Sequence, residues 1–335
     1  MEPDSLASMT EQRLPITAGD EGDAVRELHQ RLAATGFTAG GDPDVFDADT
    51  VLAVRGFQAS RRLIEDGVVG MQTWGALVES DFRLGDRMLY LRAPMTRGDD
   101  VTELQWRLGS LGFDAGYVDG IFGPDTERAV RGFQTNQALT ASGVADPHTV
   151  AALERLAGRR SGDKTIAEVR EAALLHDQTG LSGRRLVVGQ AGGVGDLVEA
   201  LADQLRSTGA EVLALHHRDL STQARTANEW EGAVYLGLSG ADDDASVAYF
   251  QTDGFVSYGG RGLAAHVSEA LNRVLEGPHP GVGMRIPILR ETRMPAVWCR
   301  IAAELDEAQT TSLAMALTDA LTTWCDAPEH TFGEA

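Results

Sequence analysis

Apolar residues follow a helical rhythm at two places in the first half of the chain. The two runs are Val25, Leu28 and Leu32, and Val101, Leu104 and Leu108. Apolar positions three and four residues apart share one face of an α-helix, so each run predicts an amphipathic helix with that face buried. Gly36 and Gly112 follow the runs and suit the left-handed conformation in which many helices end.

The two runs belong to a segment that is present twice. Residues 98–153 repeat residues 22–77 at a constant offset of 76 positions and without a gap. In each copy a loop rich in Gly and Asp follows the first helix, and a second helix and a short third helix come after it. Self-similarity at a fixed offset indicates one structural module used twice. We therefore predict two all-α, three-helix modules.

From residue 184 onward the pattern changes to short apolar runs that alternate with helical ones. Strands are predicted at 186–188, 211–215, 233–238, 247–251, 284–289 and 296–301, and helices at 197–205, 262–275 and 306–324. Alternating strands and helices are typical of a mostly parallel sheet covered by helices on both faces. The fold class predicted for the whole chain is therefore multidomain, two all-α modules followed by one α/β domain.

The boundaries of these parts follow from where each pattern starts and stops. We predict a disordered segment at 1–19, modules at 20–80 and 96–156, a polar linker at 157–183, the α/β domain at 184–326 and a tail at 327–335. A chain of 335 residues is long enough for two or three such domains, each with its own core.

The charge of the chain narrows the range of partners. Its 50 acidic and 29 basic side chains give a net charge of −21, which repels nucleic acid and anionic membrane surfaces. No run approaches the roughly 18 consecutive apolar residues of a transmembrane helix, and the first residues do not resemble a signal peptide. The only two cysteines, Cys299 and Cys325, fit a reducing compartment. We therefore expect a cytoplasmic protein.

The repeated pattern resembles a known family. The order V-x2-L-x3-L-x3-G-F, then F-x3-T-x6-F-Q, then G-V-x4-T-x3-L is similar to the peptidoglycan-binding module found beside many cell-wall hydrolases. Most matched positions are apolar or glycine and encode the fold. Gln58 and Gln134 are polar and matched. They are candidate groove residues of the repeats, although a cap or a buried hydrogen bond accounts for them equally well.

The last domain resembles the zinc-dependent N-acetylmuramoyl-L-alanine amidases. The resemblance rests on the opening strand with its Gly192-Gly193 turn, the stretch from Leu289 to Val297 with its Met-Pro-Ala-Val, and the final helix. The whole chain resembles the CwlM-like family, which implies an amidase-like regulator or scaffold of cell-wall synthesis. The resemblance also implies partners: the UDP-N-acetylglucosamine enolpyruvyl transferase, the lipid-linked precursor flippase, and peptidoglycan or its precursors.

A hydrolytic zinc site needs about three His, Cys, Asp or Glu ligands and an open position for water. The resemblance places the first family ligand in the turn at Gln190 and Ala191, the second near Val194 and the third near Leu238. It places the catalytic Glu at Arg300. None of these residues is of the required type, and Arg300 has the opposite charge. We therefore predict a non-catalytic pseudoenzyme without zinc, in which these five positions are vestigial.

Alternative interpretations stay open at this point. One is an active amidase with rearranged ligands, drawn from His216, His217, the pair His266 and Glu269, or the acidic run 242–244. A second is a simple peptidoglycan-binding protein. A third is a phosphate-binding turn at residues 189–195, although its glycine spacing is not G-x-G-x-x-G and it has no Walker lysine.

Overall fold

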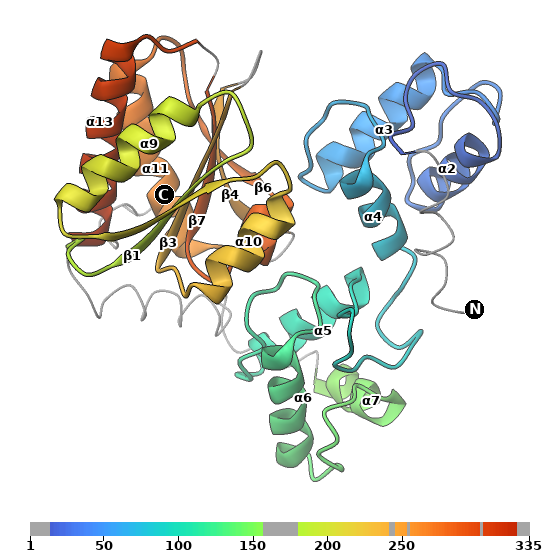
Figure 1. Cartoon of the computed structure of the whole chain (residues 1–335). Helices are drawn as coiled ribbons and strands as arrows, with labels where there is room; N and C mark the ends of the chain where they lie inside the picture. The colour runs from blue at the N-terminus through green and yellow to red at the C-terminus, as the bar shows by residue number, and fades with distance from the viewer. Residues whose placement is uncertain (1–13, 157–179, 241–244, 253–254, 302–303, 327–335) are drawn as a thin grey trace. The chain divides into compact units, whose positions relative to one another are not determined.

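The computed structural model describes residues 14–156, 180–240, 245–252, 255–301 and 304–326 (Figure 1). These residues form two compact units, one made of 14–105 and 120–156 and the other of 106–119 and 180–326. The expected tail at 327–335 and most of the expected linker lie outside the described residues. Each unit is considered by itself.

The first repeat consists of three helices, α2 (Asp23–Ala34), α3 (Ala48–Ser60) and α4 (Met71–Glu79). Its core contains the apolar residues that the helical rhythm placed inward, namely Val25, Leu28, Leu32, Val54, Phe57 and Leu77. An isolated bridge joins Ile16 to Val69, and Ile16 is buried. The folded repeat therefore begins within the segment 1–19 that was expected to be disordered, because Ile16 supplies part of the core.

The second repeat has the same element order. Its helices are α5 (Asp99–Ser110), α6 (Pro124–Asn136) and α7 (Pro147–Leu156). Isolated bridges join Leu89 to Ala145 and Arg97 to Ile121. The prediction of two all-α, three-helix modules is confirmed.

The last domain is built on a seven-stranded sheet. Its strands are β1 (Arg185–Gln190), β2 (Glu211–His216), β3 (Val234–Gly240), β4 (Ser246–Thr252), β5 (Phe255–Val256), β6 (Gly281–Met284) and β7 (Ala296–Ile301). The order is β2-β1-β3-β7-β4, and β5 and β6 both pair with β4. All pairs are parallel except those of β4 with β7 and with β5. The predicted, mostly parallel sheet is confirmed.

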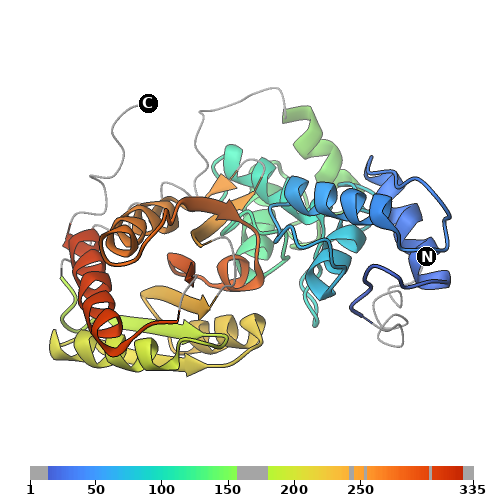
Figure 2. The same ribbon diagram turned by 90° about the horizontal axis from the view of Figure 1, so that it is seen from above.

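Helices cover both faces of this sheet, as Figures 1 and 2 show. One face packs against α9 (Gly195–Ser207), α11 (Tyr258–Val274) and α13 (Glu307–Asp326); we call it face A. The other, face B, packs against α10 (Leu220–Glu229) and α12 (Pro287–Glu291). Neighbouring residues of a strand point to opposite faces. Accordingly, Val188 belongs to the core of face A and Val187 to the core of face B.

One predicted strand is wrong in part. The sequence predicted a strand at 284–289, but the strand β6 ends at Met284 and the short helix α12 begins at Pro287. Proline suits the first position of a helix because its φ is already helical and the amide N–H it lacks would have no partner there. The helix α10 was not predicted, since few of its residues are apolar.

Candidate functional site

The ends of three parallel strands bring the sequence-predicted positions to one edge of the sheet. Gln190 of β1 lies beside Leu238 of β3, and Ser239 of β3 lies beside Arg300 of β7. In open α/β sheets, ligands bind outside the carboxyl ends of the parallel strands. This edge is therefore the candidate site of the α/β domain.

The side chains at this edge divide between the two faces. Leu238 is fully buried in the core of face A, together with Cys299 and Ile301 on β7. Because neighbouring strand residues alternate, Arg300 points to face B, and so does Ser239 beside it. The structure thus separates Leu238 from Arg300. Sequence reasoning missed Ser239, although period-two alternation along β3 could have identified it.

The glycine turn after β1 lies directly against the end of β3. The backbone N–H of Gly240 donates to the carbonyl of Gly192 across 3.2 Å, and Gly193 has a φ of 83°. A β-carbon on Gly193 would lie 3.5 Å from the Cα of Gly240, and Val194, after the turn, is buried in face A. The glycines therefore allow two backbone segments to approach closely.

A hydrogen-bonded chain of side chains starts at Gln190. Its amide Nε2 donates to Nδ1 of His216 over 2.9 Å, and Nε2 of His216 donates to the carboxylate of Glu199 over 2.8 Å; this tautomer is assigned from the network. The pair of His216 and Glu199 is solvent-exposed. The Gln190 Oε1 atom is buried and accepts no hydrogen bond from the described residues. The bond between Gln190 and His216 joins the strands β1 and β2, and β2 is the outermost strand of the sheet.

A second network supports the same strand end from face B. Gln223 donates from Nε2 to the backbone carbonyls of Gln190 and His217, at 3.0 Å and 2.6 Å. Its Oε1 accepts from the hydroxyl of Tyr235 at 2.7 Å. Burial raises the pKa of Tyr235 well above its ordinary value, so this hydroxyl remains a donor. The network fixes the ends of β1 and β2 and leaves none of these groups free for chemistry.

The described residues do not fit a zinc ion. No group of three His, Cys, Asp or Glu side chains within them lies close enough together to hold a metal. At the candidate edge Ala191, Leu238, Ser239 and Arg300 offer no imidazole, thiolate or carboxylate. The buried Nε2 of His266 has no hydrogen-bond partner among the described residues. Burial lowers the pKa of this imidazole, and the negative charge of Glu269 opposes the shift. The acidic run 242–244 lies outside the described residues.

The matched glutamines of the repeats are buried. Gln58 and Gln134 are each 1% exposed. Nε2 of Gln58 donates to Val68 O and Thr73 Oγ1, both at 3.0 Å, and its Oε1 accepts from the backbone N–H of Gly67 at 2.9 Å. Gln134 makes the equivalent bonds in the second repeat. Both therefore fasten the turn before the third helix and do not line a groove.

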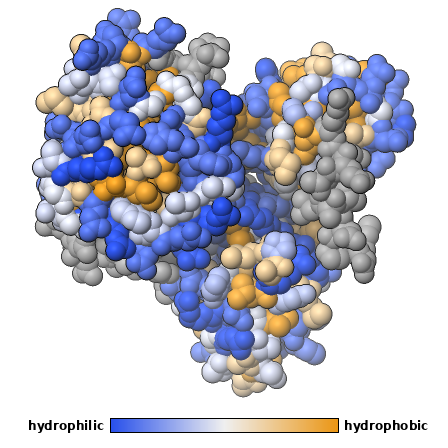
Figure 3. Space-filling view, in the orientation of Figure 1, coloured by the Kyte–Doolittle hydropathy of each residue, from blue (hydrophilic) through white to orange (hydrophobic). Residues whose placement is uncertain are grey.

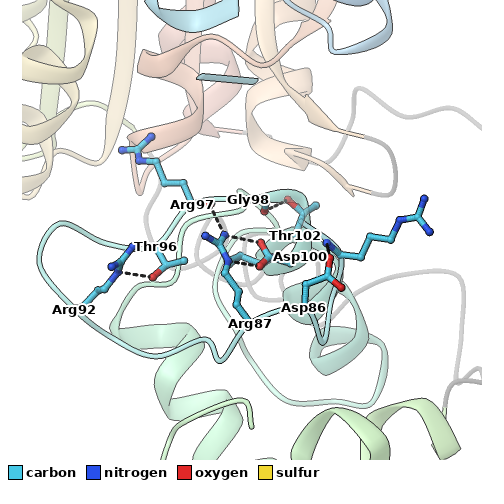
Figure 4. Close-up of polar contacts among 10 residues, drawn as sticks. Asp86, Arg87, Arg92, Thr96, Arg97, Gly98, Asp100 and Thr102 are labelled. Carbon is cyan, nitrogen blue, oxygen red and sulfur yellow. Dashed lines mark hydrogen bonds and ion pairs between the residues drawn. The ribbon is translucent and has the colours of Figure 1, made fainter. Parts of the chain in front are cut away.

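An ion pair is specific to the second repeat. Arg87 binds Asp100 through two nitrogens, at 2.7 Å and 3.0 Å, and donates to the carbonyl of Arg97 at 2.8 Å (Figure 4). Asp100 is 1% exposed, and the Arg87 guanidinium lies 3.8 Å from the centre of the Phe82 ring. Ala24 takes the place of Asp100 in the first repeat. The pair anchors the connector between the repeats to the start of α5.

A family model matches both repeats. The model of the putative peptidoglycan binding domain matches residues 21–77 and 97–153. These ranges agree with the two copies identified from the sequence. The chain therefore contains two peptidoglycan-binding domains of this type.

Relatives match far more of the chain. The Mycobacterium tuberculosis (strain H37Rv) protein named N-acetylmuramoyl-L-alanine amidase CwlM is 33% identical over 326 residues, which cover 84% of this chain and 80% of the relative. The Bacillus licheniformis amidase CwlL is 29% identical over 163 residues, covering 42% and 45%. The N-acetylmuramoyl-L-alanine amidase structure from Clostridium difficile 630 is 16% identical, covers 44% of this chain and 99% of its own, and gives a TM-score of 0.36, too low to bear on the assignment.

These names contradict the prediction that the chain is not an enzyme, and they point to an amidase-type enzyme. The prediction rested on the residue types at a few positions that were aligned with the zinc ligands and the catalytic Glu of the amidases. One of these positions is Leu238, which points to face A, whereas its neighbour Ser239 shares face B with Arg300. A shift of one residue in the alignment of a strand moves a position to the opposite face of the sheet. With a relative of 33% identity that covers most of its length, the chain belongs to the CwlM-like family, in which two peptidoglycan-binding repeats precede an N-acetylmuramoyl-L-alanine amidase-type domain.

Proposed function

We propose that the chain is a peptidoglycan-binding protein of cell-wall biogenesis. In this proposal the repeats bind peptidoglycan or its precursors, and the amidase-type domain acts on the amide bond between N-acetylmuramic acid and L-alanine. The observation that carries the proposal is the match of both repeats to one peptidoglycan-binding model.

Retention on purified peptidoglycan tests the binding. The full chain is mixed with purified sacculi and, as the control, with cellulose, a β-linked glucan that lacks both N-acetyl groups and stem peptides. We expect retention on sacculi, release by soluble muropeptides and no retention on cellulose. Equal recovery on the two polymers, or none on sacculi, would contradict the proposal.

Hydrolysis is the second candidate function, and the names of the relatives favour it. The test is an assay for new L-alanine amino groups during incubation with sacculi. Metal analysis of the same protein belongs beside it, because the described residues do not fit zinc and we propose that none is held at the edge of β1, β3 and β7. Release of product would establish the amidase reaction, whereas its absence at high protein concentration would leave binding as the function.

A regulatory or scaffold role in cell-wall synthesis extends the proposal to protein partners. The enolpyruvyl transferase of precursor synthesis and the precursor flippase are the candidates that the family resemblance implies, and the cytoplasm is the proposed location. No helix among the described residues is long and apolar enough to cross a membrane. Cell fractionation and affinity purification from lysate test these points. Recovery only from the extracellular wall fraction would contradict them.

A further inference from the structure

The loop in front of the first helix is longer in the second repeat than in the first. Two isolated bridges enclose it in each copy, and the residues that form them are Ile16 and Glu21 in the first repeat and Leu89 and Arg97 in the second. Four residues, 17–20, lie between the bridges of the first repeat, and seven, 90–96, lie between those of the second. The second copy therefore has three added residues, and we call the segment 90–96 the long loop.

Both ends of the long loop are fixed to the second repeat. The backbone N–H of Leu89 donates to the carbonyl of Ala145 at 3.3 Å, and its carbonyl accepts from the N–H of Ala145 at 2.8 Å. At the other end the carbonyl of Thr96 accepts from the N–H of Phe122 at 2.9 Å. A loop held at both ends loses less conformational entropy when a ligand binds to it than a free segment would.

Large apolar side chains gather at the long loop. Among the described residues, four of the eight exposed large hydrophobic side chains lie within 88–95, namely Met88, Tyr90, Leu91 and Met95. Tyr90 is 44% exposed and Leu91 is 37% exposed. Figure 3 shows hydrophobic residues at the surface of the second repeat, with hydrophilic residues around them. Exposed apolar side chains that are scattered singly need no explanation, but a group of them in one segment indicates a binding surface.

The long loop also reverses the charge of its counterpart. Asp20 and Glu21 give the segment 17–21 a formal charge of −2, whereas Thr96 and Arg97 occupy these two positions in the second repeat, and Arg92 brings the segment 90–97 to +2. Arg92 donates from Nε to Thr96 Oγ1 at 3.0 Å, and the Arg97 side chain points away from the ion pair of the connector (Figure 4). Both arginines are exposed. In a chain with a net charge of −21, such a surface favours an anionic ligand that also has apolar faces.

We propose that the long loop, together with Arg97, is a peptidoglycan contact of the second repeat. Peptidoglycan has both features, because its sugar rings present apolar C–H faces and its stem peptides carry carboxylates. The Tyr90 ring packs on a sugar face, and Arg92 and Arg97 pair with the carboxylates through charge-assisted hydrogen bonds. The long loop precedes 97–153, the segment that the family model matches, so it is an addition to the module. The inference rests on the proposed function and names a surface that performs it.

Retention of the full chain on purified sacculi, measured over a range of protein concentrations, tests the assignment. Tyr90→Ala and Arg92→Gln should each raise the concentration for half-maximal retention by roughly threefold to tenfold, as expected for residues at the centre of a contact. Tyr90→Phe should stay near wild type because the ring is kept. The matched control is Arg155→Gln, an exposed arginine in the last turn of α7, which should change nothing. Unchanged hydrogen exchange in 99–156 shows that each variant is folded.

Sacculi whose carboxylates have been converted to amides separate the two contributions. The wild type should bind them more weakly, and Arg92→Gln should lose little more because its partner has been neutralised, whereas Tyr90→Ala should lose as much as on untreated sacculi. If the wild type is retained on untreated sacculi and Tyr90→Ala and Arg92→Gln are retained equally well, the assignment of the long loop is wrong and peptidoglycan binding stands. If the wild type is not retained, the proposed function is wrong and the assignment falls with it. An equal effect of Arg155→Gln and Arg92→Gln would show unspecific attraction and would also overturn the assignment.

Discussion

Truncation of Gln58 gives the sharpest test of the matched glutamines. Gln58→Ala removes the acceptor of the buried Gly67 N–H and the donor to Val68 O. Val68 O still accepts a hydrogen bond from Thr73 Oγ1 at 3.3 Å, so this carbonyl loses only part of its hydrogen bonding in the variant. Among the residues that the structure describes, no other acceptor replaces Gln58 Oε1 for the Gly67 N–H.

The magnitude follows from these losses. A buried donor left without a partner costs about 1–3 kcal/mol, and the cavity left by the shortened side chain adds to it. We therefore expect Gln58→Ala to destabilise the first repeat by about 2–4 kcal/mol. Gln134→Ala should destabilise the second repeat by a similar amount, since Gly143 N–H and Val144 O occupy the same positions there.

The assay is hydrogen exchange under native conditions, read separately for peptides of each repeat. A chain with several domains does not unfold as one two-state system, so a single melting curve would mix the repeats. Each variant should lose protection in its own repeat and serve as the control for the other. Gln30→Ala, at an exposed position of the first repeat, should change little. The reasoning is refuted if Gln58→Ala changes protection no more than Gln30→Ala.

Three further outcomes are expected. Leu238→Ala should cost about 2–5 kcal/mol of stability in the sheet domain, measured by native hydrogen exchange of its own peptides, because it opens a cavity in the core of face A, whereas Ser239→Ala should cost less than about 1 kcal/mol; equal costs would contradict the assignment of faces. Thr50 donates to Asp47 from its backbone N–H and hydroxyl and so lowers the pKa of that carboxyl. This stabilisation is present above the unfolded pKa of about 3.9 and is lost as pH falls through the lower folded value, so the difference in hydrogen-exchange protection of the first repeat between wild type and Asp47→Ala should shrink on acidification; a constant difference would contradict it. Burial raises the pKa of Cys325 to about 11 and that of Cys299 further, so a thiol reagent at neutral pH should modify both only after unfolding, and prompt reaction of the folded protein would disprove their burial.

The sequence alone determined the repeats and the class of each domain. Val25, Leu28 and Leu32 recur at helical spacing and Val54 and Phe57 follow on the next helix, and these residues form the core, because burial of an apolar face is a local property of the pattern. The alternation of strands and helices likewise predicted the α/β sheet. The strand predicted at 284–289 was wrong in part, because Pro287 begins a short helix and a short apolar run does not distinguish a strand from such a helix.

Only the tertiary structure decided what the polar residues do. Gln58 and Gln134 were matched and polar in the sequence, but their burial and their bonds to the following turn depend on where the third helix packs. Leu238 and Arg300 were aligned with one site, yet the pairing of β3 with β7 turns them to opposite faces and brings Ser239 beside Arg300. The pairing of Tyr235 with Ala296 joins residues 61 positions apart. No local spacing encodes such a contact, because it forms only when separately folded segments meet.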